Sequence, residues 1–242
     1  MSIAVNHSPW LTANIQPTYK WLLALVVVVV LALGWHFPAL GFVVPVAMGA
    51  GMGGGFFRGR WVCGNLCPRG SLLDTWLSVL PRRPLPEWMS RPAVRWGVLV
   101  VLIGLMIAQL TVDLGNWRHW GIVFWRMCMI TTTAALVLAA AYAPRGWCGV
   151  CPVGTVAAWV GGEKQPLQID ASCRACGLCE QACPMQLSIA THRHAGHLPH
   201  RDCLKCSTCV KACPSQVLSW PEGQLTCRQG NTPEFSLKLP RS

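Results

Sequence analysis

Twelve of the fourteen cysteines in this 242-residue chain fall into short clusters that each end in a Cys-Pro pair. Two of the clusters, CRACGLCEQACP at 173–184 and CLKCSTCVKACP at 203–214, share the spacing C-x2-C-x2-C-x3-C-P. Thiolates bind iron, and three close cysteines followed by a fourth and a proline are typical of the ligands of 4Fe–4S clusters. The two runs therefore predict two such clusters.

In runs of this kind, the fourth cysteine binds the cluster of the other run. The first cluster is then expected to have as ligands Cys173, Cys176, Cys179 and Cys213. The second is expected to have Cys203, Cys206, Cys209 and Cys183. Two zinc sites or a set of disulfides are the alternatives, but neither requires a third close cysteine and an exchanged fourth one in both runs.

Two shorter motifs resemble each other: RGRWVCGNLCPRG begins at residue 58 and PRGWCGVCPVG at residue 144. Each follows an apolar stretch and contains Arg-Gly, Trp, Cys-Gly and Cys-Pro. The first pair, Cys63 and Cys67, is spaced C-x3-C, whereas Cys148 and Cys151 are spaced C-x2-C. We expect these four thiols to form a third redox or metal site, either as ligands of one centre or as two exchanging dithiols. The alternative is a purely structural role.

Arginines flank both of these short motifs, at positions 60, 69 and 145. A nearby positive charge lowers the pKa of a thiol and stabilises a thiolate or an anionic cluster. The arginines therefore favour a redox or metal role for the four cysteines.

The elements that position these residues are apolar. Hydrophobic residues make up 52% of the chain and charged residues only 12%, which is typical of a membrane protein. A helix needs about 20 residues to cross a hydrocarbon core of about 30 Å, and four stretches predict spans: 21–40, 42–57, 93–112 and 121–143. GAGMGG, within the second stretch, fits a dinucleotide-binding pattern but has no strand and helix around it. Its glycines are better explained by close helix packing.

The basic residues predict the orientation of the spans. The chain has a net charge of +11, and seven arginines lie in the segment 58–95, from the end of the second span to the first residues of the third, at 58, 60, 69, 82, 83, 91 and 95. By the positive-inside rule this loop and both termini are cytoplasmic, and Trp117 and Trp120 lie at the periplasmic interface. The first span is expected to be a retained anchor, because no cleavage site precedes it.

The sequence thus predicts an α-helical membrane protein with four transmembrane helices, arranged as two duplicated helix pairs, and a small C-terminal α+β ferredoxin-like domain with two clusters. The expected divisions are a cytoplasmic segment 1–20, a transmembrane domain 21–164, a ferredoxin-like domain 165–222 and a tail 223–242.

A few residues outside the clusters invite separate interpretation. Arg126 lies inside the fourth span, where ionisable residues are functional candidates; it could pair with Asp113, contact a quinone head group, or extend to the interface. Cys128 is expected to be a small buried hydrophobe, and Cys227 a free thiol. Four histidines between the two long runs could bind a metal, but a solvated loop is the preferred interpretation: His192, His194, His197 and His200.

Taken together, the four spans, the paired Cys-Pro motifs and the double cysteine run resemble the polyferredoxin-like membrane iron–sulfur proteins. These include the quinol-dehydrogenase membrane subunit of periplasmic nitrate reductase systems, the nitrous-oxide-reduction regulator and the copper-maturation protein of cbb3-type oxidases. The resemblance extends from the first span to residue 220, although the second Cys-Pro motif is one residue shorter than in the family. It implies a bacterial inner-membrane protein that exchanges electrons with quinone or quinol and with ferredoxin or cytochrome subunits of a respiratory reductase.

The expected function is therefore that of a membrane-bound iron–sulfur electron-transfer subunit rather than a stand-alone enzyme, because no acid–base or nucleophilic constellation is present. The first alternative is an assembly or maturation factor that reduces a metal or thiol on a partner enzyme. A component of a ferredoxin-coupled ion pump is less favoured, because the spans lack acidic residues. Lipids are expected as partners, whereas nucleic acid is not.

Overall fold

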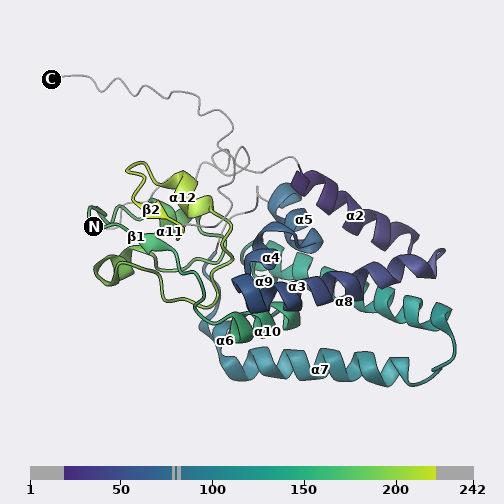
Figure 1. Ribbon diagram of the computed structural model, residues 1–242. Coiled ribbons are helices and arrows are strands. Elements are labelled where there is room, and N and C mark those ends of the chain that lie inside the picture. The colour runs from purple at the N-terminus through teal and green to yellow at the C-terminus, as the bar shows by residue number, and fades with distance from the viewer. Residues whose placement is uncertain (1–18, 78–79, 81–82, 222–242) are drawn as a thin grey trace.

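The computed structural model describes residues 19–77, 80 and 83–221. Most of the expected N-terminal segment 1–20, the residues around Arg82, and the tail with Cys227 lie outside the described residues. The described part is mostly helical, with a small unit near its C-terminal end that contains two short strands (Figure 1).

Two antiparallel helical hairpins form the apolar part of the molecule (Figure 1). The first hairpin consists of α2 (Tyr19–Leu33), the 3-10 helix η1 (Pro38–Phe42) and α3 (Val43–Arg58). The second consists of α7 (Pro92–Leu110) and α8 (Trp117–Ala141). Both hairpins turn at the end of the molecule that is remote from the two strands, so their open ends meet next to the C-terminal unit.

Three of these segments are long and apolar enough to cross a membrane, namely 38–58, 92–110 and 117–141. The predicted first span, 21–40, needs correction, because α2 contains only 15 residues and ends at Leu33. A β-carbon at Gly34 would collide with the indole of Trp125, and Pro38, which lacks an amide hydrogen, begins the next helix. Residues 38–40 therefore belong to the second span, and α2 is about 22 Å long.

The fourth predicted span also has a different beginning. The helix α8 begins at Trp117, four residues earlier than expected, because the Asn116 side chain accepts hydrogen bonds from the amides of Arg118 and His119 at 3.0 and 3.4 Å. Trp117 and Trp120 therefore lie in the first turn of α8 rather than in a loop.

Aromatic and glycine contacts join the two hairpins near their turns. The indole of Trp35 packs edge-on against Trp125 with ring centres 5.6 Å apart, and Phe42 packs against Phe124 at 5.7 Å. A β-carbon at Gly41 would collide with the backbone of Gly121. The two hairpins thus approach one another closely, which fixes their relative position.

Short helices lie at the open ends of the hairpins: α4 (Trp61–Asn65), α5 (Pro68–Trp76), α6 (Glu87–Ser90), α9 (Trp147–Val150) and α10 (Pro152–Gly161). The two Cys-Pro motifs have the same local structure. In each, the first cysteine lies in a single helical turn, α4 or α9, and the proline after the second cysteine begins a longer helix, α5 or α10. Proline suits this position because the first helical amide has no intrahelical acceptor.

The C-terminal unit contains β1 (Gln168–Ile169), α11 (Leu178–Ala182), η2 (Ala190–Ala195), α12 (Thr208–Ala212) and β2 (Leu218–Ser219). The strands are antiparallel, with Gln168 opposite Ser219 and Ile169 opposite Leu218. The helices α11 and α12 pack on one another over a core that includes Leu167, Ile189, Leu198 and Leu204. This arrangement agrees with the predicted α+β unit.

The backbone of this unit repeats itself with an offset of thirty residues. Left-handed conformations occur at Ala175 and Lys205, at Gly177 and Ser207, and at Gln186 and Gln216, all with φ between 50° and 77°. Non-glycine residues adopt this conformation only when the surrounding structure holds them there, at a cost of about 1–3 kcal/mol each. The two cysteine runs therefore have the same backbone conformation, with strained φ angles at equivalent positions.

Candidate metal centres

The first long cysteine run and the last cysteine of the second run surround one cavity of about 180 Å³. Its lining contains the four cysteines predicted for the first cluster, Cys173, Cys176, Cys179 and Cys213. Cys179 lies in α11, whereas Cys213 directly follows α12. Because α11 and α12 pack together, the fourth cysteine of one run reaches the first three of the other.

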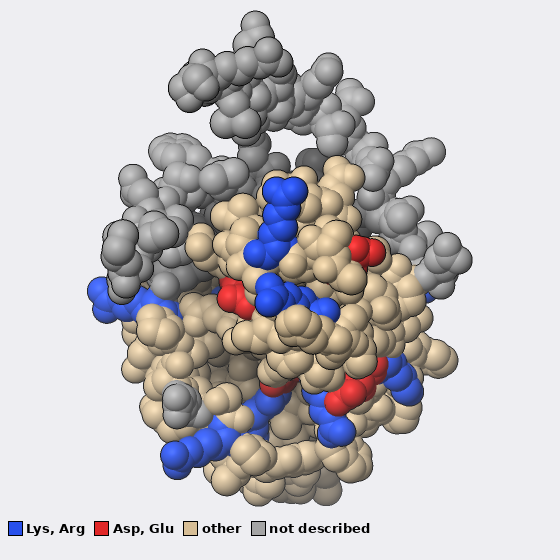
Figure 2. All heavy atoms as spheres, turned by 90° about the vertical axis from the view of Figure 1, so that its left-hand side faces the viewer, with Lys and Arg blue, Asp and Glu red and all other residues tan. Residues whose placement is uncertain are grey.

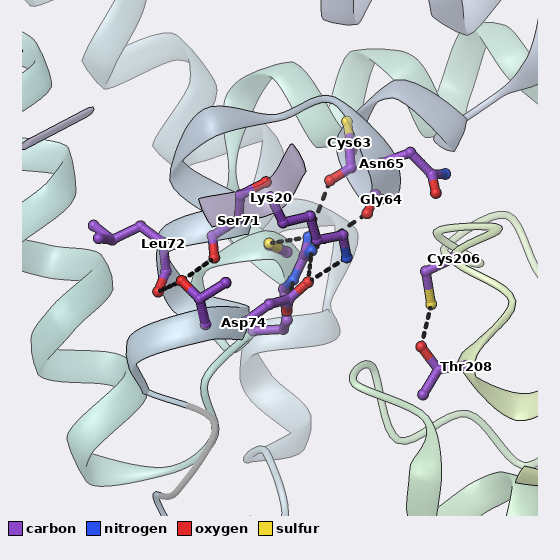
Figure 3. Close-up of polar contacts among 12 residues, drawn as sticks. Lys20, Cys63, Gly64, Asn65, Ser71, Leu72, Asp74, Cys206 and Thr208 are labelled. Carbon is purple, nitrogen blue, oxygen red and sulfur yellow. Dashed lines mark hydrogen bonds and ion pairs between the residues drawn. The ribbon is translucent and has the colours of Figure 1, made fainter. Parts of the chain in front are cut away.

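A second cavity, of about 20 Å³, contains the complementary set Cys183, Cys203, Cys206 and Cys209 in its lining. This cavity is much smaller than the first, and the Cys206 sulfur is 3.3 Å from the Thr208 hydroxyl (Figure 3). The side chains must move apart to admit a cluster. Nevertheless, each cavity is lined by three cysteines of one run and by the fourth cysteine of the other run, which is the exchange predicted from the spacing.

The donor atoms fit iron–sulfur clusters, because each cavity has four thiols and no competing carboxylate in its lining. Within the described part of the chain, no three His, Cys, Asp or Glu side chains form a group that could hold a single metal ion. Burial raises the pKa of Cys203 to about 12 and that of Cys179 to about 11. A bound metal must therefore displace the protons, as is usual for thiolate ligands.

The four cysteines of the shorter motifs also come together. A third cavity, of about 130 Å³, contains Cys63, Cys67, Cys148 and Cys151 in its lining. It lies where the open ends of both hairpins meet, and it extends between α2 and α3. The structure thus brings both Cys-Pro motifs to one place, which the sequence predicted from their similarity.

Two buried arginines link the Cys-Pro motifs to each other reciprocally. Arg60, which precedes the first motif, donates to the carbonyl oxygen of Cys148 in the second. Arg145, which precedes the second motif, donates from Nη1 to the carbonyl oxygen of Cys63 at 3.0 Å. Both arginines are only 1% exposed. Each motif therefore positions a cysteine of the other.

The glycines that follow the Cys-Pro pairs also contact the arginine of the opposite motif. A β-carbon at Gly154 would lie 2.5 Å from a guanidinium nitrogen of Arg60, and one at Gly70 would lie 2.7 Å from Arg145. Both motifs therefore share a pattern in which arginine, cysteine, proline and glycine have fixed roles, R-x2-C-G followed by C-P-x-G. The similarity was visible in the sequence, but the reciprocal contacts were not.

Two carboxylates neutralise part of the buried positive charge. Asp74 accepts from Arg145 Nε and Nη2 at 2.7 and 2.6 Å and from Lys20 Nζ at 2.8 Å (Figure 3). Asp202 accepts from Arg60 at 2.8 Å and from Arg95 at 2.9 and 2.6 Å. Burial alone would raise the pKa of both carboxyls, but the neighbouring cations hold each pKa below its ordinary value.

The positive side chains outnumber the carboxylates around this third cavity. The ion pairs join Lys20, Arg60, Arg95 and Arg145 to only two acids, Asp74 and Asp202. Arg69, which also lines the cavity, has no ion pair with a carboxylate among the residues the structure describes. An anionic group such as a thiolate-bound cluster would be stabilised by this excess charge.

The expected effect of the arginines on the thiols is outweighed by burial. Burial raises the pKa of Cys63 to about 12, and the charge of Arg60 offsets only part of this. The pKa of Cys148 is also raised by burial, against the charge of Arg145. Without a metal these two residues are therefore neutral thiols rather than the thiolates predicted from the flanking arginines.

Arg126 and Asp113, the residues predicted to pair or to bind quinone, do not meet. Both are exposed, and no ion pair or hydrogen bond joins them in the described structure. Neither contributes to the linings of the three cysteine cavities. The predicted pairing is therefore not formed, and the role of Arg126 stays a prediction.

Cys128 is buried in α8, as expected of a small hydrophobe, but it also lines the third cavity. The four histidines make local contacts: His192 and His197 bond to nearby carbonyl oxygens, His194 to Arg193, and His200 to the Asp202 amide. These contacts join each of the four histidines to residues close to it in the sequence.

Comparison with protein families agrees with the cysteine geometry. A family model described as a 4Fe-4S dicluster domain matches residues 172–218. A second, described as a 4Fe-4S binding domain, matches both 40–86 and 125–167, the segments with the Cys-Pro motifs. No curated protein and no solved structure matches the chain significantly. The chain is therefore an iron–sulfur protein with ferredoxin-type 4Fe–4S domains and three apolar helices that could span a membrane.

Proposed function

We propose that this protein is a membrane-bound electron-transfer subunit that passes electrons between the quinone pool and a partner oxidoreductase. It would then be a relative of the polyferredoxin-like membrane proteins that its sequence resembles. The observation that supports this most directly is the series of three cysteine-lined cavities, which begins among apolar helices and ends at the exposed side of the C-terminal unit.

The contacts between these cavities suggest an order of transfer. Cys63 and Cys148 pack against the apolar core of the C-terminal unit. The Asn65 amide donates to the carbonyl oxygen of Lys205 at 3.2 Å, and a β-carbon at Gly64 would collide with the backbone of Leu204. Leu204 and Lys205 line the second cavity. The second cluster would therefore receive electrons first from the membrane side.

The first cluster would then exchange electrons with the partner protein. Cys176 is exposed, and the neighbouring Leu178 is 41% exposed. Figure 2, which views the molecule from the end formed by this unit, shows basic and acidic side chains interspersed among uncharged ones. An apolar contact beside an exposed cluster ligand suits a transient electron-transfer partner, whose interface is usually small.

The chemistry requires one-electron carriers, which the clusters would supply when bound. Oxidation of a quinol releases two electrons and two protons, so two one-electron acceptors and an exit for protons are needed. The residues of this chain hold the acceptors in place: Arg60 and Arg145 fix the cysteine backbone and neutralise negative charge. The protons would leave to water, and the partner would take the electrons one at a time.

The proposal includes a location and a division of the chain. We infer that residues 21–164 form a transmembrane domain in the bacterial inner membrane with the 58–95 loop on its cytoplasmic side, and that 165–222 and both termini are cytoplasmic. The arginines support this, because Arg58 ends α3 and Arg91 and Arg95 lie at the beginning of α7, at the helix ends nearest to the C-terminal unit. The two matches to one family model support a duplicated membrane domain.

The main alternative is a maturation factor that reduces a metal or thiol on a partner enzyme. Such a factor needs accessible, reactive thiols. Burial and the raised pKa values of Cys63 and Cys148 make these thiols poor nucleophiles, so electron transfer through a bound centre is favoured.

The test is the double variant Cys63→Ser/Cys67→Ser in membranes or detergent. We expect it to retain about eight irons per chain in the two ferredoxin-type clusters, because their cysteines lie elsewhere, and dithionite should reduce both. Quinol should no longer reduce them. The measurement is the EPR signal of the clusters after addition of quinol. Reduction by quinol at the parent rate would show that the third cavity is not on the path.

A further inference from the structure

We propose that the third cavity has a second occupant beside its cysteines: the head group of an isoprenoid quinone, hydrogen-bonded by Arg69, with its tail leaving between α2 and α3. This inference depends on the proposed function, because it names the place where the quinone would bind. It is a different place from the one predicted at Arg126 and Asp113, which stays a prediction.

The walls of the cavity are of two kinds. One side is formed by the cysteines and arginines of the Cys-Pro motifs, and the other by aliphatic side chains of α2 and α3, including Val30 and Met48. Val26 and Val43 lie at the rim, since they line the cavity yet are 39% and 38% exposed. The cavity therefore opens through an apolar rim onto the outer surface of the helices, where lipid would lie. A ligand with a polar head and a hydrocarbon tail fits this division.

Arg69 supplies the donor for the head group. It lies in the first turn of α5, and its Nη2 donates to the Thr131 hydroxyl of α8 at 2.7 Å. Its Nε is buried and has no hydrogen-bond partner in the described structure. An unpaired buried N–H costs free energy, so a carbonyl oxygen placed beside Nε would be stabilised.

Two other buried donors beside this cavity also lack partners: Arg60 Nε and Trp147 Nε1. Arg60 is bonded to Cys148 and to Asp202 of the C-terminal unit, whereas Arg69 contacts α8. The two arginines therefore lie at different ends of the cavity. Arg60 is on the side of the clusters, and Arg69 is on the side of the membrane helices, which leaves Arg69 available to the quinone.

The depth of Arg69 favours a quinone over a phospholipid head group. Its partner Thr131 lies ten residues before the end of α8 at Ala141, which corresponds to about 15 Å along the helix. Phosphate groups of lipids stay near the membrane surface, whereas a quinone head is uncharged and can enter the hydrocarbon. The head would also lie close to Cys67, two residues before Arg69 in the sequence.

The inference can be tested on the full-length protein with an azido-ubiquinone photolabel and mass spectrometry. We expect the label on peptides from α2 and α3, and we expect excess quinone to displace it. The variant Arg69→Gln should reduce labelling and raise the KM for quinol about tenfold, the size expected when a hydrogen bond to a charged group is lost. Reduction of the clusters by dithionite should be unchanged. Arg58→Gln is the matched control, because Arg58 packs on the Trp61 ring rather than in the cavity.

A second pair of variants tests the tail. Val26→Phe should narrow the rim and reduce labelling, whereas Val29→Phe should not, because Val29 is exposed and does not line the cavity. Equal labelling of all four variants would overturn the inference, as would a raised KM in Arg126→Leu but not in Arg69→Gln. Displacement of the label by anionic phospholipid but not by quinone would show a lipid site instead. If quinol does not reduce the clusters of the parent protein at all, the proposed function itself fails.

Discussion

Arg60 and Arg145 place two positive charges where almost no water reaches them. A buried ion pair contributes little net stability, because desolvation offsets the Coulomb attraction, but removing one partner is strongly destabilising. These arginines are therefore better explained by positioning than by stability. Each donates a hydrogen bond to the carbonyl oxygen of a cysteine in the opposite motif, and its guanidinium packs against a glycine of that same motif.

This explanation predicts that Gly154→Ala is destabilising. The new methyl group would lie 2.5 Å from Arg60 Nη2 and 3.2 Å from its Cζ, and the ion pair with Asp202 prevents the guanidinium from moving away. We expect a loss of about 1–3 kcal/mol, as for other overpacked sites, measured by thermal unfolding in detergent. Gly53→Ala is the control, since nothing lies within 4 Å of a β-carbon there. Equal melting temperatures for both variants would contradict the proposed packing.

Asp202 is one of the residues that hold the C-terminal unit against the helices, together with the hydrogen bond from Asn65 to Lys205. Its folded-state pKa is held below that of the unfolded chain, about 3.9, so the stability from its ion pairs is present above that pH and is lost as the pH falls through the folded-state value. Between pH 6 and 8 Asp202 stays ionised, so the contribution of its ion pairs to the attachment should not change. Asp202→Asn should loosen it throughout this range, because Arg60 and Arg95 lose their carboxylate.

Hydrogen exchange of residues 202–209 measures this attachment. We expect faster exchange in Asp202→Asn than in the parent and no change in Asp113→Asn, whose side chain is exposed. Exchange that is no faster in Asp202→Asn than in the parent at the same pH would show that the ion pairs do not hold the unit in place.

Among the helices, the sequence correctly predicted those features that depend on local residue patterns. The helices α7 and α8 follow their apolar runs, and each Cys-Pro proline begins a helix, as its fixed φ favours. The end of α2 was missed, because it depends on the distant Trp125 packing over Gly34. The reciprocal arginines were missed for the same reason: a repeated motif is visible in a sequence, but the partner of each copy is set by tertiary contact.

The arrangement of the hairpins predicts a topology. Both hairpins have their open ends beside the C-terminal unit and their turns at the other end (Figure 1). Reporter fusions after residues 90 and 165 should therefore remain in the cytoplasm, and a fusion after residue 115, between α7 and α8, should be exported. Export of either of the first two would contradict the orientation expected from the arginines.

For the whole molecule, the third cavity shortens the route that electrons must take. It reaches the middle of α8 through Cys128, so a quinol bound there would deliver electrons without crossing the full hydrocarbon core of about 30 Å. The two ferredoxin-type cavities continue the route away from the membrane helices. A periplasmic reductase would then need another subunit to return the electrons, whereas a cytoplasmic partner could dock directly.

The order of the centres follows from their contacts and can be tested by removing one cluster at a time. The second cavity adjoins the Cys-Pro motifs, because its residues Leu204 and Lys205 touch Gly64 and Asn65, whereas the lining of the first cavity contains no residue of these motifs. Cys206→Ala should therefore prevent quinol from reducing the first cluster, although dithionite still reduces it. Cys176→Ala removes a predicted ligand of the first cluster and should leave reduction of the second cluster by quinol at the parent rate. EPR of quinol-treated and dithionite-treated samples separates these outcomes. If quinol reduces the first cluster at the parent rate in Cys206→Ala, electrons enter the C-terminal unit by another path.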